Sequence, residues 1–222
     1  MALPKPDKKE ISAICQARGI TYPENIFEPV SEAALSALSE GFIDRSKALN
    51  LLSWLENNTD LAALFPNRQL LAALKKSTCS EEWRPEAEHD LVHFISAVYF
   101  NKSTLNENLY QLIQNPPQLF GDLYSALFDE TTDFIPLTLK LAAFTGPFKF
   151  GSRKDCFEQI RRCGGAPTNI LSSTDYLFVS EDHICNRVLS SSMVDAICVR
   201  LFFGKLKIYR ESLFSIEGLS GD

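Results

Sequence analysis

The stretch FTGPFKFGSRKDC, residues 144–156, runs from the end of an apolar segment through a Thr-Gly pair and an aromatic loop. The segment LKLAAF (139–144) is short and largely apolar, which is typical of a buried strand. Ser152, with Asp155 three residues later, predicts an N-cap with its capping box and therefore a helix that begins near residue 153. The stretch thus predicts a strand, a loop and a helix, in the manner of an α/β fold.

The same alternation continues to the end of the chain. Gly164-Gly165 predicts the end of the first helix, and Gly204 the end of a second helix over 190–203. Further strands are predicted at 166–169, 176–179 and 205–209, and RESLFSI is expected to begin a short last helix. This order of elements predicts a small parallel four-stranded sheet flanked by helices.

The first half of the chain has helical periodicity instead. Apolar residues recur at helical spacing in four segments: 31–42, 45–58, 67–77 and 83–100. Asp44 is a predicted N-cap, and Pro85 occupies the first turn of a predicted helix. We therefore predict an all-α N-terminal domain over residues 1–136 and an α/β C-terminal domain over residues 137–222.

Composition narrows the class of protein. No apolar run approaches the roughly 18 residues that a membrane span needs, and the N-terminal MALPKPDKKEISA lacks the apolar core of a signal peptide. We predict a cytoplasmic protein without a membrane partner. The six cysteines are scattered and form no C-x-x-C pair, so reduced thiols are expected.

Charge is distributed unevenly. Residues 1–138 contain 11 Lys/Arg and 19 Asp/Glu, a balance of −8, whereas residues 139–222 contain 11 and 9, a balance of +2. Screening at cellular salt acts over roughly 8 Å, so each half presents its own charge to partners. The charge of the acidic half disfavours nucleic-acid binding, and the charge of the weakly basic half allows such binding without predicting it.

Residues 138–219 resemble the BRCT domain, a module shared by DNA-repair proteins and the tail of bacterial NAD-dependent DNA ligases. The resemblance rests on Thr145-Gly146 at a strand end, Gly151-Ser152-Arg153 at a helix start, Gly164-Gly165 after that helix, TDYLFV (174–179) in the third strand, and the ending KLKIYRESLF. FTGPFKFGSR with the GG turn and TDYLFV is especially similar to small bacterial BRCT proteins that carry a helical N-terminal module.

The resemblance implies a phosphate pocket at Thr145, Gly146 and Arg153. The Thr hydroxyl and the Gly146 N–H can both donate to a phosphate oxygen, and the missing Cβ of glycine lets an anion approach the backbone. An arginine that points back toward the strand can make a two-pronged contact with phosphate. The alternative is that Thr145 is a strand-end residue and Gly146 merely turns the chain.

One position departs from the family pattern. Phosphate-binding members usually carry a Lys in the second helix, four residues before an Ala, and counting back from Ala196 gives Ser192 here. The neighbours Ser190, Ser191 and Met193 supply no charge either. Because charge-assisted hydrogen bonds are roughly twice as strong as neutral ones, Ser192 predicts a weaker pocket unless another cation compensates.

Three cations are candidates for a supporting role. Arg153 or Arg187 would compensate for the missing Lys if either lies beside the pocket. Lys205 is predicted on a solvated strand edge, from which it could touch a nucleic-acid backbone. If no cation compensates, the domain is left as a packing surface.

Enzyme signatures are weak. HDLVH (89–93) superficially echoes the H-E-x-x-H zinc-protease motif, but the catalytic Glu is replaced by Asp90 and no third ligand is evident. The sequence shows no P-loop, no G-x-S-x-G and no G-x-G-x-x-G. We therefore predict no catalytic residues, no metal and no cofactor, with a zinc hydrolase using His89 and His93 as the least favoured alternative.

The function expected from the resemblance is non-enzymatic recognition in DNA replication or repair. The partner would be DNA ends or nicks, or a phosphorylated or unmodified protein. The alternative is a purely structural module for protein–protein interaction or dimerisation, in which the phosphate pocket is degenerate. In that case the chain is expected to form a homodimer or to bind another protein.

Overall fold

The computed structural model describes residues 17, 26–80, 82–130, 134–214 and 219–220. Their contacts form two compact units: residues 25–127 with 200–204, and residues 128–199 with 205–222. The predicted boundary at 136/137 therefore moves to 127/128. The reason is that Asp129 donates its N–H to the Ile208 carbonyl and accepts the Ile208 N–H on its carboxylate, both at 2.8 Å, which fixes it along the last strand of the second unit.

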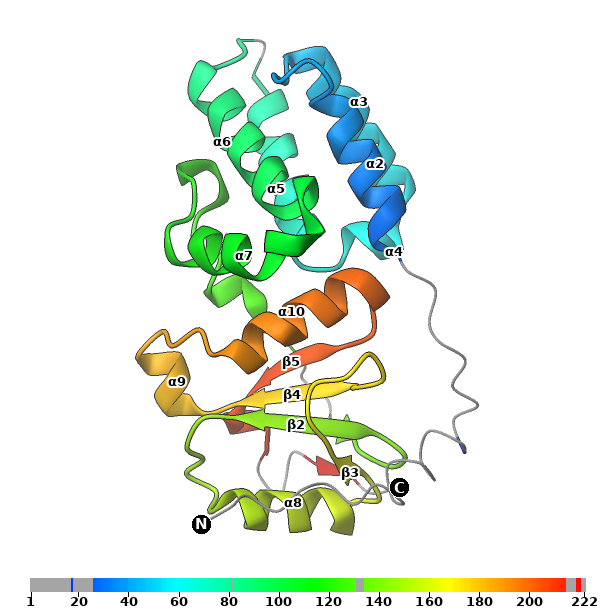
Figure 1. Cartoon of the computed structure of the whole chain (residues 1–222), viewed down its shortest axis with the longest axis vertical. Helices are drawn as coiled ribbons and strands as arrows, with labels where there is room; N and C mark the ends of the chain where they lie inside the picture. Colours follow the sequence, from blue (N-terminus) through cyan, green and yellow to red (C-terminus); the bar gives the residue numbers. More distant parts are fainter. Residues whose placement is uncertain (1–16, 18–25, 81, 131–133, 215–218, 221–222) are drawn as a thin grey trace. The chain divides into compact units, whose positions relative to one another are not determined.

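The first unit is helical. It contains α2 (Phe27–Ala37), α3 (Arg45–Asn57), α4 (Thr59–Ala62), α5 (Asn67–Thr78), α6 (Pro85–Ile95), a π-helical turn η1 (Ser96–Phe100), a 3₁₀ turn η2 (Lys102–Thr104), α7 (Leu105–Gln114), and 3₁₀ turns η3 (Gln118–Phe120) and η4 (Ser125–Leu127) (Figure 1). The predicted N-cap is confirmed, since Asp44 accepts the Lys47 N–H at 2.8 Å. No helix in the described parts of the chain is both long and apolar enough to cross a bilayer.

The first helix of this unit begins earlier than its sequence pattern indicated. Helix α2 starts at Phe27 and buries Phe27, Val30, Ala34 and Ala37. Leu35 and Leu38, which the helical spacing within residues 31–42 would put on one face with Ala34, are only half-buried.

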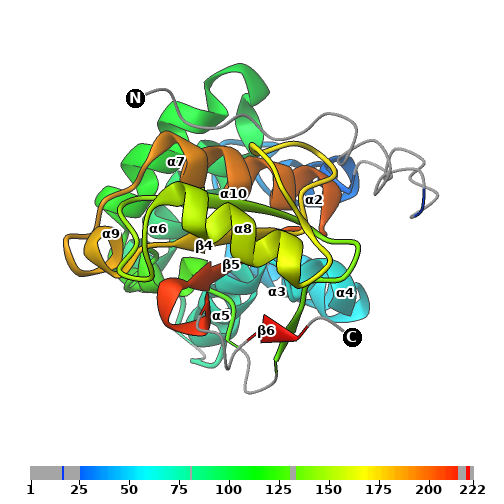
Figure 2. The same ribbon diagram turned by 90° about the horizontal axis from the view of Figure 1, so that it is seen from below.

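The second unit contains the parallel sheet that the sequence predicts. Its elements are β1 (Ile135–Pro136), β2 (Leu141–Thr145), α8 (Arg153–Arg162), β3 (Ala166–Pro167), β4 (Tyr176–Val179), α9 (Glu181–Cys185), α10 (Ser191–Phe203, with its residues from Arg200 onward in the first unit), β5 (Lys207–Arg210), η5 (Glu211–Phe214) and β6 (Leu219–Ser220). The four-stranded sheet has the order β3-β2-β4-β5 with every neighbour parallel, and β1 pairs with β6 separately. Helices α8 and α10 cover opposite faces of the sheet (Figures 1 and 2).

The register of the sheet places its two ends. Thr145, Val179 and Arg210 lie side by side at the carboxyl end of β2, β4 and β5, and Tyr176 pairs with Lys207 at the amino end. Helix α9 is an addition to the predicted order. Its five residues are too few to show a periodic pattern, and its start is fixed by Ser180, whose hydroxyl accepts the His183 N–H at 3.3 Å.

The face of the sheet toward α8 holds an aromatic core. Phe144 contacts Phe178, with ring centroids 5.6 Å apart, and Phe214 at 5.1 Å. Helix α8 begins at the predicted capping box, since the Asp155 N–H bonds the Ser152 hydroxyl and the Ser152 N–H bonds the Asp155 carboxylate at 2.7 Å. The core and the cap together fix the loop 146–151 between β2 and α8.

Candidate functional site

The carboxyl end of the sheet brings together most of the predicted site residues. In a parallel sheet the strands end at one edge, so the loops and helix starts that follow them gather there. Thr145 ends β2, Ser180 follows β4, and α10 begins just after Ser190. We call this the carboxyl edge.

Thr145 lies beside a hydroxyl that its sequence position did not reveal. Its Oγ1 is 2.8 Å from the Ser190 Oγ, and Ser190 Oγ also lies 3.3 Å from the Met193 N–H, which it caps. Thr145 is 6 % exposed and Ser190 is half-buried. Each hydroxyl has one proton to donate, and the bond between them uses one, so the pair retains one O–H donor for a ligand.

The packing around Gly146 gives a reason for a glycine that the sequence did not indicate. Its φ is +91°, and a Cβ at this position would lie 2.0 Å from the Ser180 Oγ and 2.9 Å from the His183 ring. The space next to the glycine is therefore taken by the first turn of α9, and close packing of β2 against α9 explains this residue. Gly146 itself is exposed, and so it can still offer its backbone to a ligand.

Arg153 points back toward the strand, which is the orientation that a two-pronged contact with phosphate at this end would need. It is the first residue of α8, it is half-buried, and one of its guanidinium nitrogens donates to the carbonyl oxygen of Phe144. A guanidinium has five N–H donors. The hydrogen bond to Phe144 uses one of them and holds the cation at the end of β2.

The remaining predicted residues divide between the two ends of the sheet. Ser192 lies in the first turn of α10, half-buried, two residues after the serine that contacts Thr145. Arg187 is exposed in the connection between α9 and α10, with φ of 51°. Lys205 is exposed and precedes β5, so it lies at the amino end of the sheet and not with Thr145.

Glu211 is a further residue of the carboxyl edge that the sequence pattern did not indicate. It is 7 % exposed, and its two oxygens accept the N–H groups of Lys149, Phe150 (3.1 Å) and Glu181 (2.9 Å). A buried carboxylate thus ties the β2–α8 loop to the start of α9. Its sequence context suggested only the beginning of a last helix, and the acceptor role depends on residues about 30 and 60 positions away.

Three cysteines of this unit, Cys156, Cys163 and Cys198, are poor nucleophiles. Burial raises the pKa of the Cys156 thiol to about 12, with smaller contributions from the Glu211 and Asp155 carboxylates. Burial also raises the pKa of Cys198 to about 12, and that of Cys163 above its usual value. A thiol with such a pKa carries almost no thiolate at neutral pH.

The two histidines of HDLVH lie exposed on α6. Asp90 between them accepts the Leu119 N–H at 2.7 Å, so its carboxylate anchors a loop. Within the described residues, no group of three or more His, Cys, Asp or Glu side chains is placed to hold a metal ion.

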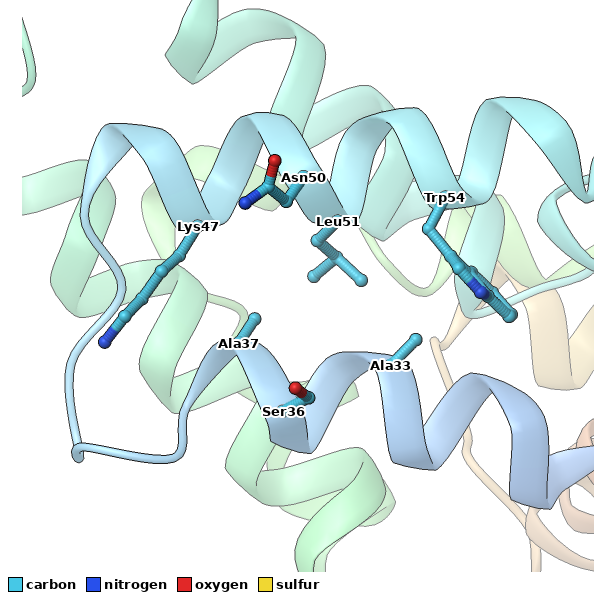
Figure 3. Close-up of a pocket in the computed structure, with 7 residues that line it drawn as sticks. All are labelled: Ala33, Ser36, Ala37, Lys47, Asn50, Leu51 and Trp54. Atoms are coloured by element: carbon cyan, nitrogen blue, oxygen red, sulfur yellow. The ribbon is translucent and has the colours of Figure 1, made fainter.

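The helical unit contains a groove that was not predicted. It lies between α2 and α3, has a volume of about 240 Å³, and is lined by Ala33, Ser36, Ala37, Lys47, Asn50, Leu51 and Trp54. Figure 3 shows the small side chains of α2 facing Leu51, with Lys47 at one end and Trp54 at the other. The signal in the sequence is the run of small residues on α2, which leaves room that a larger side chain would fill.

Comparison with protein-family models, with curated proteins and with solved structures found no match for this chain.

Proposed function

We propose that this chain is a non-enzymatic recognition protein whose C-terminal unit is a BRCT-like domain that binds a phosphate group at the carboxyl edge. The observation that carries the proposal is the hydroxyl pair of Thr145 and Ser190, 2.8 Å apart where the end of β2 meets the start of α10. Arg153, bonded to the Phe144 carbonyl, adds a cation at the same strand end.

The helix start supports the same assignment. Helix α10 begins at Ser191, and the N–H groups of Ser191 and Ser192 have no intrahelical carbonyl to bind. Such groups carry partial positive charge and favour an anion. Ser192 therefore contributes through its backbone, while Ser190 contributes the hydroxyl.

The partner we assign is DNA with a 5′-phosphate at an end or a nick. A terminal phosphate carries close to two negative charges at neutral pH, whereas an internal phosphodiester carries one. A site made of hydroxyls, backbone N–H groups and one guanidinium should favour the terminal phosphate over the internal phosphodiester, because the terminal phosphate has more charge and can accept more hydrogen bonds. Because Ser192 replaces the family's Lys, we expect the discrimination to be modest, on the order of 10-fold, which corresponds to about 1.4 kcal/mol.

The test compares binding of the full-length protein to nicked duplexes with and without the 5′-phosphate at the nick. The wild-type protein should prefer the phosphorylated nick, and Thr145→Val and Ser190→Ala should each reduce the preference. Thr168→Val is a matched control, because Thr168 is 4 % exposed and its hydroxyl has no hydrogen-bond partner among the described residues. Equal affinity of the wild-type protein for both nicks would exclude the phosphate site.

A second function is favoured by the burial of Thr145. With 6 % exposure and its hydroxyl bonded to Ser190, Thr145 can also serve only to hold the start of α10 against the sheet. The unit would then be a phosphate-independent protein-contact or dimerisation module. A concentration-independent dimer in light scattering, together with equal binding of the two nicks, would identify this function.

A further inference from the structure

The amino end of the four-stranded sheet gathers five basic residues that the phosphate site does not use. Three belong to strand starts and two to the end of a helix that runs back to the same edge: Lys140, Lys205, Lys207, Arg161 and Arg162. We call this set the basic edge.

Backbone contacts fix these residues at one end of the sheet. The Lys140 carbonyl accepts the Ala166 N–H at 2.9 Å, four residues after the end of α8 at Arg162. The Lys207 N–H donates to the Asp175 carbonyl at 2.8 Å, and the Asp175 N–H donates to the Leu141 carbonyl at 2.9 Å. The starts of β2, β4 and β5 and the end of α8 are therefore close along one edge.

Two carboxylates near this edge, Asp175 and Asp129, accept backbone N–H groups. Asp175 accepts the Leu141 N–H at 2.8 Å and lies 3.5 Å from the Lys140 ammonium, with its side chain 8 % exposed. Asp129 accepts the Ile208 N–H. Over the described part of the chain, Lys205 and Lys207 form no ion pair, and both are exposed. The edge thus presents a net positive charge to solvent.

The opposite edge has a different charge. The first turns of α8 and α9 carry Asp155, Glu181 and Asp182, and Glu211 is buried among them. Cations such as Arg153, Lys154 and Arg210 also lie at this edge, where the four carboxylates offset them. The small net charge of +2 over residues 139–222 therefore hides a separation, with the carboxylates concentrated at the carboxyl edge.

An exposed leucine in a strained conformation lies within the basic edge. Leu139 precedes Lys140, has φ of 59°, and is 43 % exposed. A left-handed backbone costs a residue with a Cβ roughly 1–2 kcal/mol. Such strain, held here by the bond from the Leu139 N–H to the Gly164 carbonyl at 2.9 Å, is found preferentially where a surface has a function.

We propose that the basic edge docks the phosphate backbone of double-stranded DNA without regard to sequence. Four strands at about 4.8 Å spacing span roughly 14 Å, comparable with the ~12 Å width of the major groove. Arg161 and Arg162, near β3, and Lys205 and Lys207, near β5, therefore reach phosphates on both sides of the groove. This surface is separate from the carboxyl edge and does not depend on the phosphate site.

The test measures the affinity of the full-length protein for a 20-base-pair duplex with 5′-hydroxyl ends, over a series of salt concentrations. Each neutralised phosphate contributes about 0.9 to the slope of log K against log salt. The double variant Lys205→Gln/Lys207→Gln should lower the slope by about 2 and the affinity at 50 mM salt at least about 10-fold.

The matched control is Lys149→Gln/Lys154→Gln, which removes two exposed lysines from the loop and helix start at the carboxyl edge. It should leave slope and affinity close to those of the wild-type protein. Equal losses in the two double variants would reduce the effect to net charge and overturn the proposal. Failure of the wild-type protein to bind the duplex would also overturn the proposal. If the protein bound polyglutamate as tightly, per negative charge, as it binds the duplex, the basic edge would instead be a site for an acidic protein partner, and the proposal would be overturned as well.

The two proposals fail in different ways. The double variant Lys205→Gln/Lys207→Gln should lower the affinity for both nicked duplexes by the same factor and leave the preference for the 5′-phosphate intact. Thr145→Val should reduce that preference and leave the salt slope unchanged.

Discussion

The hydroxyl oxygens of Thr145 and Ser190 lie 2.8 Å apart, although 45 residues separate them in the chain. Ser190 also caps α10 through the Met193 N–H. Ser190 therefore caps the start of α10 and also links it to the end of β2. Ser192, inside the first turn of the helix, does neither.

The first prediction separates these two serines by stability. Ser190→Ala removes a cap and a partly buried hydrogen bond and should lower the free energy of unfolding by about 1–2 kcal/mol. Ser192→Ala should change it by less than about 0.5 kcal/mol, because alanine is the better helix former. Urea unfolding followed by circular dichroism measures both. Equal destabilisation by the two substitutions would contradict the capping assignment.

The contrast between these serines shows what the sequence can reveal. The capping box of Ser152 and Asp155 is local, since both residues belong to one turn, and it was predicted correctly together with the strand at 176–179. The contact between Thr145 and Ser190 depends on how α10 crosses the sheet, which no local pattern specifies.

Gly146 and Lys205 illustrate two further limits. The sequence shows a glycine at the end of the strand but not why a larger residue would not fit. A Cβ at this position would clash with Ser180 and His183, which lie more than 30 residues away in the sequence. The sequence predicts Lys205 on a solvated strand edge but does not say which end of the sheet that edge faces. In a parallel sheet a residue before a strand lies at the amino edge, so topology alone places it away from Thr145.

The second prediction concerns Glu211, which binds three backbone N–H groups from two loops. Glu211→Gln replaces one acceptor oxygen by a donor that faces an N–H group. We expect a loss of about 2–3 kcal/mol in the free energy of unfolding, because hydrogen bonds to charged groups are the stronger ones. Glu158→Gln is the control, since Glu158 is partly exposed and lies 3.8 Å from Lys154 across one helical turn. Its effect should stay below about 0.5 kcal/mol. An unchanged free energy of unfolding in Glu211→Gln would show that the two loops keep their positions without the carboxylate.

The third prediction tests why Gly146 is a glycine. Gly146→Ala should cost about 1–2 kcal/mol for its positive φ and a further amount for the Cβ that meets the Ser180 Oγ. Ser180 is fully buried and caps α9, so its hydroxyl cannot turn away without losing that bond. Gly41→Ala isolates the backbone part, because Gly41 has φ of +81° and nothing within 4 Å of the added Cβ. Thermal or urea unfolding should show the larger loss for Gly146→Ala, and equal losses would remove the packing explanation.

The fourth prediction follows from the cysteines of the second unit. Burial raises the pKa of Cys156 and of Cys198 to about 12, against an ordinary value near 9. The folded state therefore keeps protons that the unfolded state releases above about pH 9. Stability contributed by each thiol is complete below pH 9 and is lost as the pH rises toward 12, with a slope of about 1.4 kcal/mol per pH unit for each group.

Unfolding in urea at pH 8, 9, 10 and 11 measures this slope. Cys156→Ala should lose less stability between pH 9 and 11 than the wild-type protein, because the variant has no thiol to ionise at that position. Cys185→Ala is the control, since Cys185 is exposed, and its pH dependence should match the wild type. The same difference should appear in alkylation of the native protein at pH 8, where Cys79 and Cys185 react readily and Cys156 reacts only after denaturation. Rapid labelling of Cys156 in the folded protein would show that its thiol is accessible and ionised, and the predicted loss of stability at high pH would then disappear with it.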